Sequence, residues 1–423
     1  MSISYATFDA AKTAARLFDD VAAFSADTAG VSRPAFSPTE TQTLQYLENY
    51  ARGQGLCVNY DAGKNAVFSL PEDADANKFI LVGSHVDSVP NGGNYDGLAG
   101  VVAGLLCLAR AKNEGIGFAK PVKVIALRAE ESAWFGPCYI ASKALLGQLA
   151  DSELSAVHQG DGRNLGAHMS EIGINMNRVR QHKPLMDPDN IERYIELHIE
   201  QGPLLIEKNL PAAVVSGIRG NIRYKKIRCV GEAGHSGAVP RAYRKDPVLA
   251  MADLLTRLDE SWLAILQKGE DLVLTSGMVS TDPAKHALTR IPDQVDFSLD
   301  FRSQSADALE AMRDLLRDEI RSVERERGVK FELDPELYTA PALCDEKMVD
   351  ALSNSMAKVN LKPFSMPSGG GHDAAVFANA GIPSAMVFVR NRNGSHNPDE
   401  VMEIPDLIAG TNIIFEYLIE AAL

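Results

Sequence analysis

Apolar residues recur with two different periods along the first part of the chain. At residues 10–24 and 97–109 they follow helical spacing, which predicts two amphipathic or buried helices. Residues 78–84 and 122–127 are short apolar runs, which are typical of buried strands. Strands that alternate with helices predict a largely parallel sheet with helices on both faces.

Polar residues mark the start of another helix near residue 37. Ser37 is expected at the N-cap, Pro38 at the first helical position and Glu40 at the third. Serine and glutamate side chains accept hydrogen bonds from amide groups that the first helical turn leaves without partners, and proline has no such amide. A helix is therefore expected to begin at residue 38.

The middle of the chain has a different pattern. Residues 222–230 alternate between apolar and polar side chains, as a strand with one exposed face does. The patterns of a helix, two strands and a second helix follow at residues 246–267, 272–280, 294–302 and 306–327. This order is that of a ferredoxin-like α+β unit. Buried-strand character returns from about residue 329, with an apolar run at 384–389 and a closing helix at 404–421.

These patterns predict an α/β fold that a second domain interrupts. Residues 1–215 and 328–423 are expected to form a discontinuous α/β domain with a mixed, mostly parallel sheet. Residues 216–327 are expected to form an inserted ferredoxin-like α+β domain. A length of 423 residues is consistent with two or three domains.

Composition and charge narrow the class of protein. With 45% hydrophobic and 23% charged residues, the chain has the composition of a soluble globular protein, so disorder is excluded. Its 42 Lys+Arg and 56 Asp+Glu give a net charge of −14, which argues against a nucleic-acid or membrane surface as partner. The five cysteines are scattered, and the N-terminus has no apolar signal region, so we expect a cytoplasmic protein.

Histidines and carboxylates follow several of the strand-like segments. His85 and Asp87 come directly after one apolar run, and Asp96 opens the next helix. Three more groups stand at similar positions: Glu130-Glu131, His198 and His396. In open α/β sheets, ligands bind at the carboxyl ends of the strands. Three histidines and several carboxylates at that edge suit two divalent ions of the zinc class.

Each of these residues has a simpler explanation when it is considered alone. A Gly-Ser-His segment is usually a loop, and a Glu-Glu pair is usually solvated. Five such sites, each at the end of a strand, favour the metal interpretation. Glu130 and Glu131 point to opposite sides of an extended chain, so one can ligate while the other serves as a base only if the chain turns there.

Six segments resemble the amidase branch of the M20 family of di-metal peptidases. In chain order they are GSHVDSVPNGGNYDGLAGV, RAEESAWFG, ELHIEQGPLL, AGHSGAVP, SGGGHDA and GSHNPDE. This hydantoinase/carbamoylase branch contains N-carbamoyl-L-amino-acid hydrolases, β-ureidopropionases and allantoate amidohydrolases. The resemblance runs from about Ser37 to Leu423 and implies a di-metal catalytic domain with an inserted lid or dimerisation domain. It also implies a homodimer built through the inserted domain.

The resemblance implies two divalent metal ions per chain. His85 and His198 would hold one ion, and Glu131 and His396 would hold the other. Asp96 would bridge the two. Zinc is favoured, with manganese, cobalt and nickel as alternatives.

Two further residues would act beside the metals. Glu130 would be the general base that takes a proton from the attacking water. Asp87 would orient the imidazole of His85, as the neighbours of metal-bound histidines usually do. A loop cap is the alternative role for Asp87.

Other residues are implied in substrate binding. His235, in the inserted domain, would polarise the scissile carbonyl, often in the neighbouring subunit's site. Arg302 would clamp the substrate carboxylate with its planar guanidinium. Gln201 and Gly371 would line the same pocket. A structural histidine and a flexible glycine turn are the alternatives for His235 and Gly371.

The chain departs from the family pattern at two positions of this pocket. Thr289 stands where the family usually has asparagine, and His286 is a substitute donor three residues earlier. Ile222 stands before Arg223, where allantoate amidohydrolases carry a further arginine. Both changes argue against allantoate as the substrate.

We therefore expect a metal-dependent amidohydrolase that cleaves a linear ureido or amide C–N bond next to a carboxylate. An N-carbamoyl amino acid is the favoured small-molecule substrate. An aminoacyl peptidase or deacylase of the wider family is the alternative, and an allantoate amidohydrolase is less favoured. A metal-stabilised binding protein without catalysis is the rival from another class, but a purely structural site has no use for a free base such as Glu130.

Overall fold

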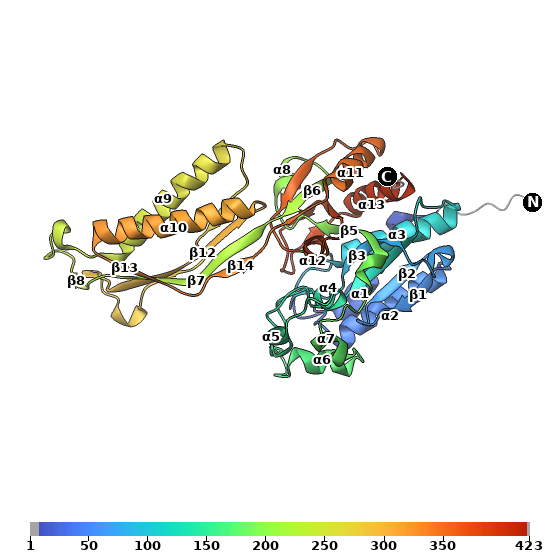
Figure 1. Cartoon of the computed structure of the whole chain (residues 1–423), viewed down its shortest axis with the longest axis horizontal. Helices are drawn as coiled ribbons and strands as arrows, with labels where there is room; N and C mark the ends of the chain where they lie inside the picture. The colour runs from blue at the N-terminus through green and yellow to red at the C-terminus, as the bar shows by residue number, and fades with distance from the viewer. Residues whose placement is uncertain (1–7, 421–423) are drawn as a thin grey trace, which may run out of the picture. The chain divides into compact units, whose positions relative to one another are not determined.

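The computed structural model describes residues 8–420, within two compact units of the chain (Figure 1). The first unit comprises Met1–Gly217 and Leu343–Leu423, and the second comprises Ile218–Ala342. The second unit continues beyond residue 327, where the sequence pattern ended the inserted segment. The reason is that strands β13 (Lys330–Leu333) and β14 (Leu337–Thr339) pair with β7 (Gly220–Val230).

Among the described residues, nine strands form the sheet of the first unit. In spatial order, eight of them are β1 (Cys57–Tyr60), β2 (Ala66–Ser69), β4 (Val122–Leu127), β3 (Phe79–His85), β5 (Ile191–Ile199), β17 (Ser384–Val389), β6 (Ala212–Ile218) and β15 (Ala342–Leu343). Strand β16 (Ser365–Ser368) pairs with β6. The central strands β4, β3, β5 and β17 are parallel, whereas β1, β2 and β6 pair in the antiparallel sense. The expected mixed α/β fold is confirmed, with its parallel pairs at the centre of the sheet.

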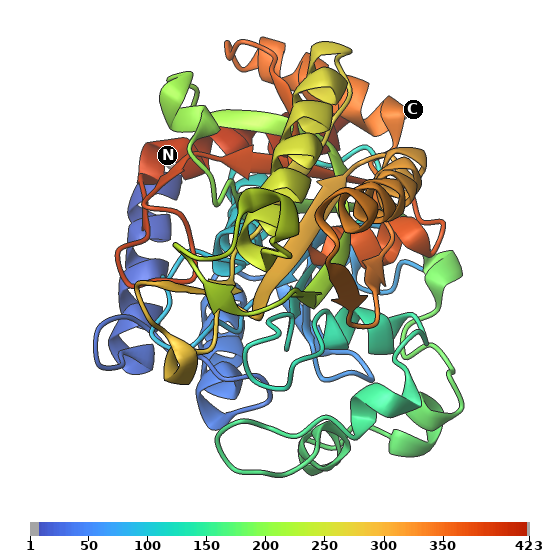
Figure 2. The ribbon, with the colours of Figure 1, turned by 90° about the vertical axis from the view of Figure 1, so that its left-hand side faces the viewer.

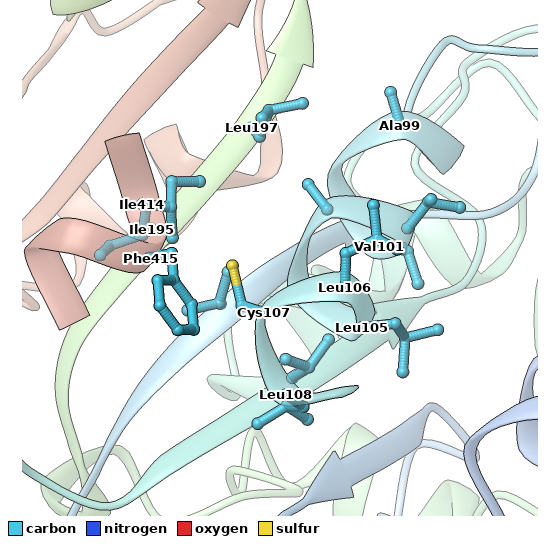
Figure 3. Close-up of a cluster of buried hydrophobic side chains, with 14 of the residues drawn as sticks. Ala99, Val101, Leu105, Leu106, Cys107, Leu108, Ile195, Leu197, Ile414 and Phe415 are labelled. Carbon is cyan, nitrogen blue, oxygen red and sulfur yellow. The ribbon is translucent and has the colours of Figure 1, made fainter. Parts of the chain in front are cut away.

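One layer of helices shares a hydrophobic cluster with this sheet. Its members are α1 (Ala10–Ser25), α2 (Pro38–Gly53), α3 (Leu98–Glu114), α11 (Glu346–Lys358) and α13 (Ile404–Glu420). Figure 3 shows part of the cluster, where α3 side chains lie near Ile195 and Leu197 of β5 and Phe415 of α13. The predicted end of the closing helix, at residue 421, lies outside the described residues.

The other face of the sheet carries the second helical layer. Because successive strand residues point to opposite faces, Tyr194 and His198 of β5 face away from the cluster. Tyr194 stacks on Phe377 of α12 (Asp373–Asn379), with ring centroids 3.9 Å apart. The shorter helices of this unit are α4 (Ile140–Leu145), α5 (Asp151–Leu154), α6 (Leu165–Glu171), α7 (Met176–Arg180) and α8 (Leu204–Glu207). None of the helices in the described part of the chain combines the length and apolar character that a membrane span requires.

The second unit is an antiparallel sheet covered by two helices. The sheet contains β10 (Val279–Ser280), β12 (Gln294–Ser303), β7 and β13 in that order, and β9 (Val273–Thr275) and β14 pair with β12 and β7. Helices α9 (Pro247–Gln267) and α10 (Ala306–Arg327) lie side by side and share one hydrophobic cluster with the sheet (Figure 2). A final strand, missed in the sequence pattern, completes the β-α-β-β-α-β order. Two short strands, β8 (Gly234–His235) and β11 (Arg290–Ile291), pair separately.

Candidate metal centre

The loops at the carboxyl ends of the central parallel strands bring the candidate ligands together. His85 ends β3, His198 lies at the end of β5, and Glu131 follows β4. Asp96 precedes α3, and His396 lies beyond β17, in the loop that joins β18 (Asn391–Arg392) to β19 (Val401–Met402). The chain positions therefore converge at one sheet edge, as the strand-end rule predicts.

The two oxygens of the Asp96 carboxylate face two different groups of ligands. Oδ1 lies 2.9 Å from His198 Nε2 and 3.5 Å from His85 Nε2. Oδ2 lies 3.5 Å from His396 Nε2, which is itself 3.4 Å from Glu131 Oε1. The five residues thus form two groups that share Asp96, the same two groups that the sequence resemblance implied.

The donor atoms fit divalent cations of the zinc class. Ligand atoms about 2.0–2.1 Å from a tetrahedral zinc ion lie about 3.3 Å from one another. The separations of 2.9–3.5 Å around Asp96 fall on both sides of that value. Imidazole nitrogens with carboxylate oxygens are also the donor set that zinc and related metals accept.

Electrostatics gives a second reason to expect cations at this place. Burial raises the pKa of the Glu130 and Glu131 carboxyls well above the usual value, and the charge of Asp96 adds to the effect on Glu131. Burial opposes the charged form of His85, but Glu130, Asp87 and Asp96 outweigh it and raise the pKa of His85 well above 6.5. The same buried carboxylate charge that favours the protonated imidazole is what divalent cations offset in a metal site.

A residue in a left-handed conformation comes directly before the two adjacent glutamates. Ala129 has φ +50°, which is unusual for a residue other than glycine. Asp87 stabilises this turn with both carboxylate oxygens. Its Oδ1 accepts a hydrogen bond of 2.9 Å from the backbone amide of Glu130, and its Oδ2 accepts one of 3.0 Å from the backbone amide of Glu131. The chain therefore changes direction immediately before this pair, at Ala129. Glu131 belongs to the group formed with Asp96 and His396. Glu130 belongs to neither ligand group, although its Oε2 lies 3.9 Å from His85 Nε2.

Asp87 also lies beside His85, where the resemblance placed it. Its Oδ1 is 3.4 Å from His85 Nδ1, and its backbone oxygen is 3.1 Å from the same nitrogen. The side chain of Asp87 is fully buried. Asp87 therefore contacts three groups of the centre at once: one imidazole and the two glutamate amides.

Gly97 lets the imidazole of His85 occupy its place. Its φ is +67°, and a Cβ added to it would lie 2.4 Å from ring atoms of His85. No side chain fits at that distance without displacing the ring. The glycine after Asp96 is thus required by both backbone conformation and close approach.

Two residues, Gln201 and Glu400, form hydrogen bonds with Asp96 that the sequence pattern did not predict. Gln201, expected in the substrate pocket, donates from Nε2 to Asp96 Oδ2 at 2.8 Å. Glu400 accepts the amides of Tyr95 and Asp96 at 2.8 and 3.2 Å, and burial raises its pKa to about 7. Glu400 ends the GSHNPDE segment, and its position there is the one sequence signal that could have identified it.

The glycine-rich segment lies against the same side of the centre as His198. The ring of His372 packs edge-on against the ring of His198, with centroids 4.4 Å apart. Its Nε2 forms a hydrogen bond of 2.9 Å with Ser368 Oγ. A Cβ on Gly371 would lie 1.7 Å from the hydroxyl of Tyr139, so only glycine fits there. Burial lowers the pKa of His372 well below 6.5, which favours the neutral imidazole.

The remaining predicted site residues belong to the second unit. Arg302 pairs with Asp300 at 2.9 Å, and Arg223 Nε lies 3.3 Å from the same carboxylate. The three side chains share the sheet face opposite the buried Ile222 and Phe301. The structure thus brings Arg223 and Arg302 together.

His235, Thr289 and His286 also lie in this unit. His235 is exposed in β8 beside β11, and its Nδ1 accepts the Gly237 amide at 3.1 Å. The backbone carbonyl oxygen of Thr289 accepts a hydrogen bond of 2.8 Å from the backbone amide of Ser236. His286 Nε2 lies 2.6 Å from Thr281 Oγ1, beside a surface cavity of about 450 Å³. His235 and Thr289 are therefore near neighbours through their backbone.

One further histidine group of the first unit is a poor metal site. His158, Asp161 and His168 lie close together, but their donor atoms already have partners. His158 Nδ1 accepts the amides of Gly160 and Asp161 at 3.2 Å each, and Arg163 Nε pairs with Asp161 at 2.8 Å. A cation at this group would have to displace these bonds and approach a guanidinium.

Comparison with known proteins identifies the relatives of this chain. Residues 81–420 match the peptidase family M20/M25/M40. An N-carbamoyl-L-amino-acid amidohydrolase of Pseudomonas sp. (strain NS671) is 30% identical over 392 residues, which are 92% of this chain and 93% of the relative. An allantoate amidohydrolase of Escherichia coli (strain K12) is 29% identical over 95% of this chain and 96% of that one. The crystal structure of an amidase of the hydantoinase/carbamoylase family from Burkholderia multivorans has a TM-score of 0.87 and 27% identity, covering 97% of this chain and 98% of that one.

We predict that Gly97→Ala weakens metal binding through His85. The new methyl group would occupy the space of the imidazole, so apparent zinc affinity should fall by about 10–100-fold. The measurement is zinc content after dialysis against a graded series of chelator concentrations.

Gly115→Ala is the matched control, because Gly115 ends the same helix with φ +68° and has open space at its Cβ position. Gly115 is in the left-handed helical region, where alanine costs about 1–2 kcal/mol, whereas Gly97 has ψ −53°, outside that region, so alanine is strained more there. Equal zinc retention in the two variants would contradict the steric role of Gly97.

Proposed function

The chain belongs to peptidase family M20/M25/M40, and we propose that it is a metal-dependent amidohydrolase that cleaves a linear ureido or amide C–N bond next to a carboxylate. The favoured substrate is an N-carbamoyl amino acid. The observation that carries this proposal is the pair of ligand groups that share Asp96, with Glu130 beside them but outside both. The relatives named N-carbamoyl-L-amino-acid amidohydrolase support the choice of substrate.

Five residues would hold two divalent ions. His85 and His198 would bind one, Glu131 and His396 the other, and Asp96 would serve both through its two oxygens. Zinc fits the donor set best, with manganese, cobalt and nickel as alternatives. When bound, such ions polarise the scissile carbonyl and lower the pKa of a bound water to about 7.

Glu130 is suited to move the proton in this reaction. Burial raises the pKa of its carboxyl, so the group can accept a proton from the attacking water and later release it. The proton passes to the leaving nitrogen as the C–N bond breaks. For an N-carbamoyl amino acid, addition of one water yields the amino acid, carbon dioxide and ammonia. Asp87 maintains this arrangement by fixing the amides of Glu130 and Glu131.

Residues of the second unit would recognise the substrate. The planar guanidinium of Arg302 matches a carboxylate, and Arg223 shares its Asp300 partner. His235 would polarise the scissile carbonyl, with His286 and Thr289 as further donors. In the first unit, Gln201 and the backbone of Gly371 would also contact the substrate.

Allantoate is the less favoured substrate, although one relative is an allantoate amidohydrolase. Ile222 stands where such enzymes carry a second arginine. Its side chain is fully buried in the cluster of the second unit and offers no polar group. A peptide or acyl amino acid is the other alternative.

A homodimer built through the second unit and a cytoplasmic location complete the proposal. Leu263 and Leu266 on α9 are 57% and 45% exposed, which suits a surface that a second copy covers. The short strands β9 and β10 lie at the side of the sheet, where a partner strand can add. The scattered cysteines support a reducing compartment.

The test of the proposed function is a substrate panel. We expect the zinc-loaded protein to hydrolyse N-carbamoyl amino acids faster than formyl or acetyl amino acids, dipeptides and allantoate, with ammonia and free amino acid as the measured products. Dialysis against chelator should abolish turnover, and added zinc should restore it. If a dipeptide or allantoate is cleaved faster, that compound class and not the N-carbamoyl amino acids is the substrate. Turnover without metal would overturn the proposed mechanism.

Glu130→Gln is expected to keep the fold and the metals but to lose turnover. The amide has nearly the same shape but cannot accept the proton, so kcat should fall by about 10²–10⁴-fold. Steady-state kinetics and metal analysis of the same sample provide the measurement. A near-normal kcat in the fully loaded variant would exclude Glu130 as the base.

Mixing two inactive variants tests the dimer and His235 together. We expect Glu130→Gln and His235→Ala chains, combined under conditions that allow exchange, to regain activity, because a mixed dimer contains one competent site. Light scattering establishes the oligomeric state of each sample. A dimer that regains nothing would confine His235 to its own subunit, and an active monomer would exclude the dimer.

A further inference from the structure

Glu40 lies at the third position of α2, but its carboxylate does not return to the helix cap. Ser37 Oγ accepts the Glu40 amide at 3.2 Å, as the sequence predicts. The Glu40 side chain instead turns into the protein, where its exposed fraction is 0%. Its Oε2 accepts the Phe36 amide at 3.0 Å and Arg128 Nη1 at 2.5 Å, and its Oε1 accepts the Ala129 amide at 3.0 Å.

Burying the Glu40 carboxylate costs desolvation free energy, which a side chain that capped the helix at the surface would avoid. Burial raises the pKa of Glu40 to about 7, against the opposing effect of Arg128. A carboxylate withdrawn from water is retained only where several donors need it. Two of its donors, the side chain of Arg128 and the amide of Ala129, belong to the turn that precedes Glu130.

The turn is held from both sides along its backbone. The amides of residues 129, 130 and 131 are bound by the carboxylates of Glu40 and Asp87 alone. The carbonyl oxygens of Ala129 and Glu130 accept the amides of Ile140 and Tyr139 at 3.0 and 2.8 Å. Ala129 is the residue with φ +50°, and Glu40 is the acceptor for its amide. Without that acceptor, the amide of Ala129 itself loses its partner, and the turn is held only through the neighbouring amides and carbonyl oxygens, against the preference of alanine for a right-handed or extended conformation.

We propose that Glu40 is a positioning residue for Glu130: by holding the Ala129 amide it keeps the left-handed turn that directs the Glu130 carboxylate toward the reacting groups. This inference rests on the proposed function, in which Glu130 is the general base. It assigns a mechanistic purpose to a side chain that the sequence places at a helix start, far along the chain from the metal ligands.

The decisive variant is Glu40→Gln, compared with Arg128→Gln. Glutamine offers one oxygen where the carboxylate offered two, so the amides of Phe36 and Ala129 and the guanidinium of Arg128 compete for it. Arg128→Gln breaks the same buried ion pair but leaves both oxygens of Glu40 for the Ala129 and Phe36 amides. Both variants therefore lose the ion pair between Glu40 and Arg128. Only Arg128→Gln keeps a carboxylate oxygen as the acceptor for the Ala129 amide.

We expect Glu40→Gln to lower kcat by about 10–100-fold, since a misplacement of about 1 Å at a reacting group has effects of this size. KM should be unchanged, because the proposed carboxylate clamp belongs to the second unit. The metal content should also be retained, because Asp87 still binds the Glu131 amide at 3.0 Å and the other four proposed ligands lie outside this turn. Arg128→Gln should lose a similar amount of thermal stability but keep kcat within about 3-fold. The substrate is the N-carbamoyl amino acid that the unmodified enzyme hydrolyses fastest.

The double variant Glu40→Gln/Glu130→Gln separates this inference from the proposed function. If Glu40 acts through Glu130, the double variant should be no slower than Glu130→Gln alone. If Glu130→Gln alone keeps full turnover, the assignment of the base fails. If Glu130→Gln is inactive but Glu40→Gln is normal, or if Arg128→Gln lowers kcat as much as Glu40→Gln, only the positioning role fails.

Glu40→Asp keeps the inference testable if Glu40→Gln does not fold. Aspartate retains the charge beside Arg128 but is one methylene shorter, so it does not reach the Ala129 amide as Glu40 does. It should therefore show the same fall in kcat with metals retained. Full kcat in a folded, loaded Glu40→Asp protein would overturn the proposal.

Discussion

The hydrogen bonds from the Glu130 and Glu131 amides to Asp87 determine where two neighbouring carboxylates point, and the candidate site depends on that separation. Side chains that follow each other along an extended strand diverge, so a shared function at one sheet edge needs a turn. The turn occurs at Ala129, in a conformation that costs free energy for a residue with a Cβ. A buried carboxylate is a strong enough acceptor to stabilise it.

Such a site concentrates negative charge in the protein interior, and the surrounding residues show how the fold tolerates it. Arg33 is fully buried, and burial lowers its pKa to about 10. It donates to the Val86 oxygen at 2.7 Å and to Asn94 Oδ1 at 2.9 Å, which ties together the loop between His85 and Asp96. Arg128 is also buried and pairs with Glu40, but these two guanidinium groups are fewer than the buried carboxylates around the centre: Asp87, Asp96, Glu130, Glu131 and Glu400. The remaining charge is what makes divalent ions the natural occupants of the centre.

The two units divide the proposed work. The proposed metal ligands and Glu130 lie in the first unit, whereas Arg302 and His235 lie in the second. The departures from the family pattern, Ile222 and Thr289, are confined to the second unit. Relatives that act on N-carbamoyl amino acids and on allantoate have similar identity to this chain, 30% and 29%. This is the expected result when reaction chemistry and substrate recognition vary independently on one fold.

The sequence by itself determined the features that depend on local periodicity and on strand ends: the mixed α/β fold and the convergence of His85, Asp96, Glu131, His198 and His396 on one sheet edge. Only the tertiary structure decided how polar side chains pair between distant segments. Glu40 meets Ala129 across 89 positions, and Glu400 meets Tyr95 across 305. It also placed Gln201 on Asp96 and extended the second unit past residue 327. Periodicity reports which face of an element is buried, but which partner a buried polar group finds depends on the packing of elements that are far apart in the chain.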